Sequence, residues 1–159
     1  MSDSVSPVGD GETLLRTDFS PMHIQDGQLL PAAIRSDDLA QRGFSVDREH
    51  LVGPDTLEAR ASVQMARDTE QRKEAWISPF SCGLVRADIF PMDGSSAFRV
   101  EHEPVESNEA HAAIYSAQPR SKSEIKVLKT LLLPHLNAGL KTLASYTAEC
   151  AAAASLASE

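Results

Sequence analysis

Asp-Gly pairs between short apolar runs are the feature that most constrains how this chain folds. Asp26 and Gly27 separate the apolar runs 19–24 and 29–34. An Asp-Gly pair suits the tight turn of a hairpin, because both residues tolerate the positive φ that such a turn requires. Each run also contains a proline, which cannot donate a hydrogen bond within a sheet and prefers its edge. We therefore predict an antiparallel hairpin here, close to an edge.

A second Asp-Gly pair, Asp93 and Gly94, lies between the apolar segments 84–90 and 97–102. The same reasoning predicts a second hairpin, with a strand on either side of the turn. Two further segments have the composition of strands: 44–48 and 110–115.

Two helices are predicted in the first half of the chain. The first spans 36–43, where Ser36 can cap the N-terminus and Gly43 suits the position after the C-terminus. The second spans 54–75, with an apolar face that is narrow and rich in alanine, and we expect it to lie on the surface. The segment 76–82 that follows contains Ser-Pro and Cys-Gly steps, which indicate a loop or an irregular edge.

A longer helix is predicted from Ser121, because Ser121 and Glu124 have the spacing of a capping box. Four apolar residues then fall in one narrow arc of the helix: Ile125, Leu128, Leu132 and Leu136. Pro134 is expected to kink or interrupt this helix, since proline lacks the amide hydrogen that a helix interior uses. The alanine-rich segment 140–159 is compatible with a helix or with a frayed end.

Strands and hairpins with inserted helices predict an α+β fold: a small antiparallel sheet built from hairpins, followed by a C-terminal helical region. We expect a disordered leader over residues 1–12, since Ser, Asp, Gly and Pro there offer little to bury. A single domain over 13–133 would include the start of the C-terminal helix. Residues 134–159 would form an alanine-rich helical tail and a candidate assembly element.

Composition narrows the class of protein. The net charge of −8 over 159 residues makes nucleic acid and anionic membranes poor general partners. The two cysteines show no Cys-x-x-Cys spacing, so neither a disulfide framework nor a zinc site is indicated. The chain also lacks a signal-peptide pattern and a run of about 20 apolar residues. We expect a soluble cytoplasmic protein without a metal or another cofactor.

The five histidines are the first candidates for chemistry. None lies in a known metalloprotease, deaminase or phosphate-binding motif, and Ser45 lacks the Gly-x-Ser-x-Gly elbow of a nucleophile. His111 stands out because it lies where a polar loop enters a predicted strand, although a structural bond from its ring to a backbone carbonyl is the commoner arrangement. His23 and Arg48 complete a candidate cleft, in which two histidines act as acid and base and the arginine binds an anion.

Three functional hypotheses follow. The leading one is a non-catalytic accessory or interaction protein that binds a partner, or a second copy of itself, through its C-terminal helical region. The second is a small hydrolase or transferase that acts on an anionic substrate through the cleft of His111, His23 and Arg48. The third is a nucleic-acid-associated factor that uses the lysine stripe Lys122, Lys126 and Lys129, with Arg120 nearby.

Overall fold

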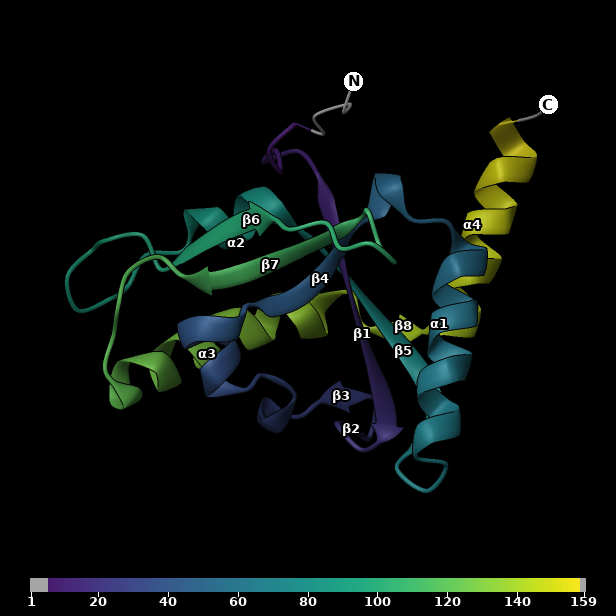
Figure 1. The fold of residues 1–159 in the computed structure, drawn as a ribbon, viewed down its shortest axis with the longest axis horizontal. Helices are drawn as coiled ribbons and strands as arrows, with labels where there is room; N and C mark the ends of the chain where they lie inside the picture. Colours follow the sequence, from purple (N-terminus) through teal and green to yellow (C-terminus); the bar gives the residue numbers. More distant parts are fainter. Residues whose placement is uncertain (1–5, 158–159) are drawn as a thin grey trace.

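A computed structural model of the chain describes residues 6–157. It is an α+β fold built on a six-stranded antiparallel sheet with the strand order β6-β7-β4-β1-β5-β8 (Figure 1). The strands of this sheet are β1 (Thr13–Pro21), β4 (Phe44–Arg48), β5 (Arg72–Ser81), β6 (Phe98–His102), β7 (His111–Ser116) and β8 (Lys141–Thr142). A separate small hairpin is formed by β2 (Ile24–Gln25) and β3 (Gln28–Leu29). The α-helices are α1 (Pro54–Arg67), α2 (Cys82–Ala87), α3 (Lys122–Ala138) and α4 (Leu143–Ala157).

Strand β1 lies inside the sheet, between β4 and β5, and forms a much longer ladder with β5 than with β4. Along one side it pairs with β5 over nearly its whole length. Along the other side it pairs with β4 at two positions, Leu14 with Arg48 and Leu15 with Asp47. Beyond Leu15 the ladder between β1 and β4 stops, and this separation positions the site described below.

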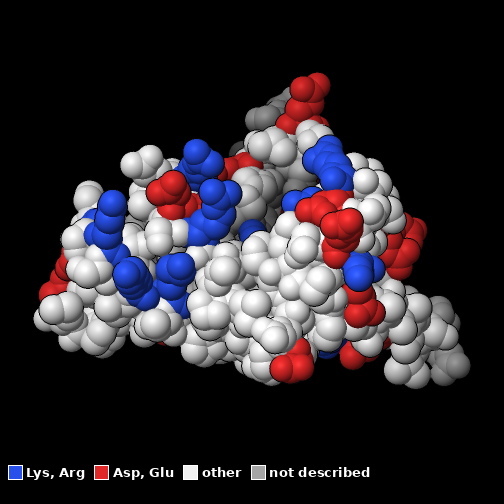
Figure 2. Space-filling view, turned by 90° about the horizontal axis from the view of Figure 1, so that it is seen from below, with Lys and Arg blue, Asp and Glu red and all other residues white. Residues whose placement is uncertain are grey.

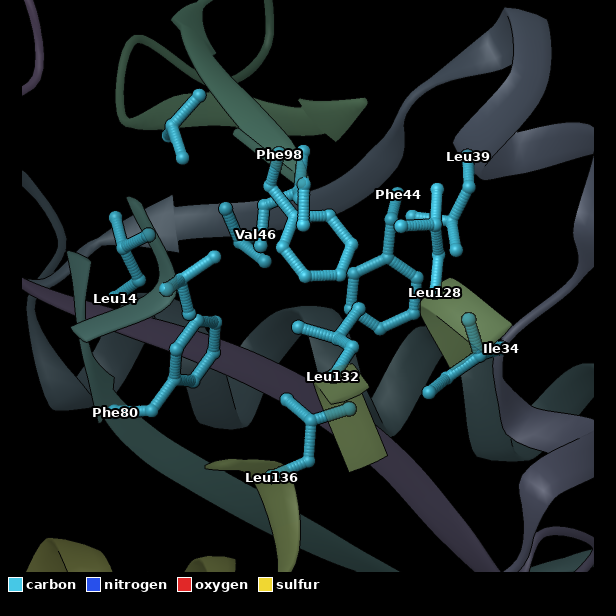
Figure 3. Close-up of a cluster of buried hydrophobic side chains, with 14 of the residues drawn as sticks. Leu14, Ile34, Leu39, Phe44, Val46, Phe80, Phe98, Leu128, Leu132 and Leu136 are labelled. Carbon is cyan, nitrogen blue, oxygen red and sulfur yellow. The ribbon is translucent and has the colours of Figure 1, made fainter. Parts of the chain in front are cut away.

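Helix α3 covers one face of the sheet and forms the main core (Figure 3). Its four predicted core residues are all buried: Ile125, Leu128, Leu132 and Leu136. They pack within one cluster that includes side chains from five strands of the main sheet, β1, β4, β5, β6 and β7, among them Leu14, Phe44, Phe80 and Phe98. Each fully buried leucine stabilises the fold by roughly 1.5–3 kcal/mol, so this stripe alone accounts for much of the attachment of α3.

Helices α1 and α4 lie together on the opposite face and cover the part of the sheet around β1 and β5 (Figure 1). The second core there contains Leu15 and Ile77 from the sheet, Leu57 from α1, and Leu143 and Tyr146 from α4. Within the described residues, helices α1 and α4 leave much of the outer face of β4, β7 and β6 uncovered, and Ser45 and Arg99 are exposed on it.

Several predictions made from local sequence are confirmed. The first Asp-Gly turn joins β2 to β3, with φ of 53° at Asp26 and 74° at Gly27. Strands β4, β6 and β7 form in the predicted segments, and a short helical turn (η2, Asp38–Arg42) precedes Gly43. Both bonds of the capping box between Ser121 and Glu124 are present at the start of α3.

Other predictions are wrong in the middle of the chain. The helix expected over 54–75 ends at Arg67, and the segment expected to be a loop is part of the long strand β5. Pro79 lies within β5, which pairs with β8 only at Trp76 and Ile77, so at Pro79 the described residues give β5 one neighbouring strand. The strand expected over 84–90 is instead helix α2, whose first turn is capped by the Ser81 hydroxyl accepting from the Leu84 amide.

Segments near both ends of the described chain contact the rest of the fold. Residues 1–5 of the predicted leader, and residues 158–159 of the predicted tail, lie outside the described part, but Val8 is buried. Helix α3 continues past Pro134 and ends before Gly139. Strand β8 then pairs with β5, and α4 buries Leu143 and Tyr146 on the other face of the sheet.

Candidate functional site

A pocket of about 270 Å³ opens where β1 and β4 separate, between helix α1 and the outer face of the sheet. Its polar lining residues are Arg16, Thr17, Ser45, Asp47, Arg60, Gln64, Asn108 and His111. They come from β1, β4, α1, β7 and the loop that enters β7. The sheet supplies one wall and the helix the other, so the polar groups are held on regular elements.

His111 and Ser45 meet at this pocket because of the strand register. His111 on β7 lies opposite Asp47 on β4, and Ser45 is two residues from Asp47, so all three side chains project from the same face. The His111 Nδ1 atom lies 2.7 Å from the backbone oxygen of Glu103, and its Nε2 atom lies 3.2 Å from the Ser45 hydroxyl oxygen. A carbonyl oxygen can only accept, so Nδ1 carries the proton, and in the neutral ring Nε2 is left as an acceptor for the Ser45 hydroxyl.

Arg16 fixes the backbone of Ser45 from the side of β1. Its Nη1 donates to the Ser45 carbonyl oxygen at 3.0 Å, and its guanidinium carbon lies 4.1 Å from the centre of the Phe44 ring. Its Nε and Nη2 donate to the two carboxylate oxygens of Asp18 at 3.3 and 3.4 Å. Asp18 is buried, and burial raises the pKa of its carboxyl group, while the neighbouring Arg16 partly opposes this rise.

Asp47 holds the opposite wall of the pocket in place. Its carboxylate accepts a 2.7 Å hydrogen bond from the Asn108 side-chain amide and bonds of 3.2 and 3.3 Å from Nη1 of Arg60. Asp47 is thus satisfied by one residue from the loop before β7 and one from helix α1. This shared carboxylate joins helix, loop and strand around the pocket.

Of the three residues predicted to form a cleft, His111 lines this pocket and the other two do not. His23 follows the end of β1, where its Nδ1 lies 4.0 Å from an oxygen of Asp18. Burial is the main cause that lowers the pKa of His23, with Asp18 opposing it. His23 is therefore linked to the pocket indirectly, through Asp18 and Arg16.

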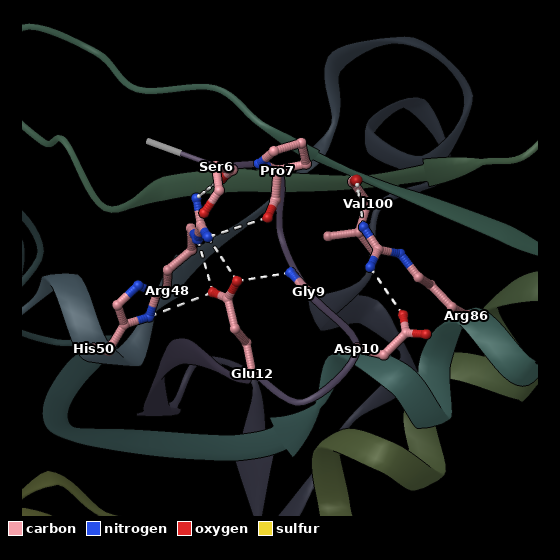
Figure 4. Close-up of polar contacts among 9 residues, drawn as sticks. All are labelled: Ser6, Pro7, Gly9, Asp10, Glu12, Arg48, His50, Arg86 and Val100. Atoms are coloured by element: carbon pink, nitrogen blue, oxygen red, sulfur yellow. Dashed lines mark hydrogen bonds and ion pairs between the residues drawn. The ribbon is translucent and has the colours of Figure 1, made fainter. Parts of the chain in front are cut away.

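Arg48 is a structural anchor in this fold (Figure 4). Its side chain is 1% exposed, and its Nε and Nη2 donate hydrogen bonds to the two carboxylate oxygens of Glu12 at 2.7 and 2.6 Å. It also donates to the backbone oxygens of Ser6 and Pro7, which fastens the N-terminal segment across β4. These bonds from Arg48 are the largest cause that lowers the pKa of Glu12.

Sequence reasoning missed most of the pocket. Ser45 lacks a nucleophile elbow, and Arg16, Arg60 and Asn108 belong to no motif. Ser45, Asp47 and His111 are brought together by the antiparallel pairing of β4 with β7, which places residues 45–47 next to residues 111–113. That pairing is not encoded in any local pattern.

Basic side chains gather on another part of the surface. Figure 2 shows Lys and Arg residues concentrated on the left of the face seen from below, the side on which α3 begins in Figure 1. Lys122 and Lys126 are exposed on α3, and Lys129 is partly buried. Arg120 does not extend this stripe, because its buried guanidinium lies 3.7 Å from the centre of the Phe90 ring.

No family model, curated protein or solved structure matches this chain. Within residues 6–157, no group of three or more His, Cys, Asp or Glu side chains is arranged to hold a metal ion. None of the helices in the same range is long and apolar enough to span a membrane.

Proposed function

We propose that this protein is a small hydrolase or transferase in which Ser45 is the nucleophile and His111 its general base. The observation that carries the proposal is the His111 ring, held by the Glu103 carbonyl on one nitrogen and facing the Ser45 hydroxyl with the other. A hydroxyl nucleophile needs an adjacent base, and the base needs a third group that orients it. Here a backbone carbonyl takes the orienting role that a carboxylate has in many such sites.

The surroundings of the pair support this chemistry. Arg16 fixes the backbone of Ser45, and the pocket beside it has room for a small substrate. When the hydroxyl attacks an ester or a phosphoryl group, its proton passes to Nε2 of His111. A well-placed base of this kind accelerates such a step by about 100- to 10,000-fold.

A fluorophosphonate probe tests the proposal without knowledge of the natural substrate. The Ser45 oxygen attacks phosphorus, a P–O bond replaces the P–F bond, fluoride leaves, and the proton passes to His111. Mass spectrometry of the digested protein is expected to find the added mass on the peptide that contains Ser45.

Two variants make this test specific. His111→Gln is expected to slow labelling of Ser45 by about 100-fold or more. His50→Gln is the matched control, because His50 is largely exposed and does not line the pocket. An unlabelled Ser45 would refute the proposal, and so would labelling that proceeds equally fast in His111→Gln.

A second candidate function is self-association through the end of α4. Residues 151–157 are all exposed and carry no charge, and Leu156 is 73% exposed. Figure 1 shows α4 beside α1, with its last turns extending past the start of α1. An uncharged exposed helix end of this kind suits contact with a second copy of the chain.

Light scattering during size exclusion checks the second candidate. The full chain is expected to be a dimer, and a chain truncated after Cys150 a monomer, since the truncation keeps the buried residues Leu143 and Tyr146. A monomeric full chain would rule this function out.

A further inference from the structure

Within the described residues, only part of the Arg60 guanidinium group forms hydrogen bonds. Its Nη1 donates to both oxygens of Asp47, at 3.2 and 3.3 Å. Its Nε and Nη2 are shielded from solvent and have no hydrogen-bond acceptor within the described residues. A buried donor without an acceptor is costly, so a turn of the Arg60 side chain that gives this edge an acceptor in the pocket would relieve that cost.

Arg48, in the same molecule, shows which groups the Nε and Nη2 edge of an arginine binds. Its Nε and Nη2 hold the two oxygens of the Glu12 carboxylate at 2.7 and 2.6 Å. That side-on pairing is the geometry in which arginine recognises carboxylate and phosphate groups. Arg60 lines the pocket, but within the described residues its equivalent pair of nitrogens has no acceptor.

The charges around the pocket favour an anion at Arg60. Among the described residues, Asp47 is the only acidic residue that lines the pocket, and that carboxylate is already shared between Arg60 and Asn108. The other lining arginine, Arg16, is paired with Asp18. The pocket lining, as far as the structure describes it, therefore includes an arginine with two unused donors and no carboxylate that lacks a partner.

We propose that Arg60 is the oxyanion-binding residue of this pocket and receives a carboxylate or phosphate group of the substrate on its Nε and Nη2 edge. Asp47 and Asn108 act as positioning residues that hold the other end of the guanidinium. Binding requires a turn of the Arg60 side chain that brings the shielded edge to the pocket, and this side chain, which is 33% exposed, is not fully enclosed by the protein. Gln64, one helical turn further along α1, lines the same wall and can donate to the anion. That the anion belongs to a substrate rests on the proposed function, whereas the anion site itself does not.

Nitrogen-15 NMR of the full chain tests the site directly, with acetate as the carboxylate probe, methyl phosphate as the phosphate probe and methylammonium as the cationic control. The Nε–H signal of Arg60 is expected to shift saturably with one or both anions and to be unaffected by methylammonium. The anion that binds more tightly identifies the substrate class. An Arg60 signal that neither anion moves, up to about 50 mM, would overturn the proposal.

Arg60→Lys keeps a positive charge beside Asp47 but removes the side-on pair of donors. Affinity for the anion is expected to fall at least about tenfold in this variant, and to be unchanged in Arg67→Lys, where the exposed arginine lies near the end of α1. Equal affinity in Arg60→Lys would contradict the proposal. If Arg60→Lys does not fold, the wild-type Nε–H signal, assigned through its own side-chain carbons, decides the question.

The two proposals fail separately. An Arg60 signal that responds to anions while Ser45 resists the fluorophosphonate would leave the anion site standing and reject the hydrolase or transferase. Labelling of Ser45 with an unresponsive Arg60 would reject the anion site alone.

Discussion

Arg16 bridges two strands where they stop pairing, since its Nη1 donates a 3.0 Å hydrogen bond to the backbone carbonyl of Ser45. The same guanidinium donates two further hydrogen bonds, from Nε and Nη2, to the buried carboxylate of Asp18. One side chain therefore spans the opening between β1 and β4 and positions the backbone of Ser45. The pocket depends on this buried ion pair as well as on the helix above it.

Arg16→Met is expected to destabilise the fold by about 3 kcal/mol, because it leaves Asp18 as a buried carboxylate without its partner. The penalty should shrink as the pH falls, since burial raises the pKa of Asp18 and a protonated Asp18 no longer needs a cation. Urea unfolding at two pH values measures this change. The double variant Arg16→Met, Asp18→Asn should lose less free energy of unfolding than the two single variants lose in sum, by at least about 1 kcal/mol. Strict additivity would contradict the pairing.

Glu12→Gln is expected to destabilise the protein by about 3 kcal/mol at neutral pH, because Arg48 then lies buried without a counter-charge. Arg48 lowers the pKa of Glu12 in the folded state. The stabilisation is therefore complete above the unfolded pKa, roughly 4.3, and is lost as the pH falls through the lower folded value. As the pH falls through the acid range, the free energy of unfolding should decrease less steeply for Glu12→Gln than for the wild type. Parallel declines would show that Glu12 is not the group involved.

Gly43→Ala tests the close approach of η2 to β7. Gly43 has a φ of 89°, and an added Cβ would lie 2.7 Å from the Ala113 Cβ and 2.9 Å from the Tyr115 ring. Gly94→Ala is the matched control, because its φ of 70° is also positive but no atom of residues 6–157 lies within 4 Å of the added atom. Chemical denaturation should give a loss of about 1 kcal/mol for Gly94→Ala and at least about 2 kcal/mol more for Gly43→Ala. Equal losses would mean that η2 moves away freely.

Leu132→Ala is expected to cost about 3 kcal/mol, because Leu132 is fully buried between α3 and the sheet. Leu156→Ala, on the exposed end of α4, should change the free energy of unfolding by less than about 0.5 kcal/mol at low protein concentration. A small effect at Leu132 would show that α3 is loosely attached.

Features that depend on neighbouring residues were predictable from sequence. The capping box of Ser121 and Glu124 and the turn at Asp26 and Gly27 are set within a few residues, where propensity decides the structure. The stripe of Leu128 and Leu132 likewise needs only helical periodicity. These elements are enough to define an α+β class.

Features that depend on distant pairing were not predictable. Strand β5 was not predicted, because proline at position 79 is unfavourable in a strand. Its position beside β1 follows from long-range pairing, in which Leu15 lies opposite Pro79. Ser45 and His111 are 66 residues apart, and a shift of one residue in the register of β4 and β7 would turn Ser45 to the other face. The candidate site is therefore a product of the sheet register.

The most direct test of the account is the protonation state of the His111 ring, measured from its nitrogen-15 chemical shifts at a pH where the ring is neutral. We predict a proton on Nδ1, which donates to the Glu103 carbonyl, and a bare Nε2 that accepts from Ser45. A proton on Nε2 would contradict this account, because His111 could then not act as the base for Ser45.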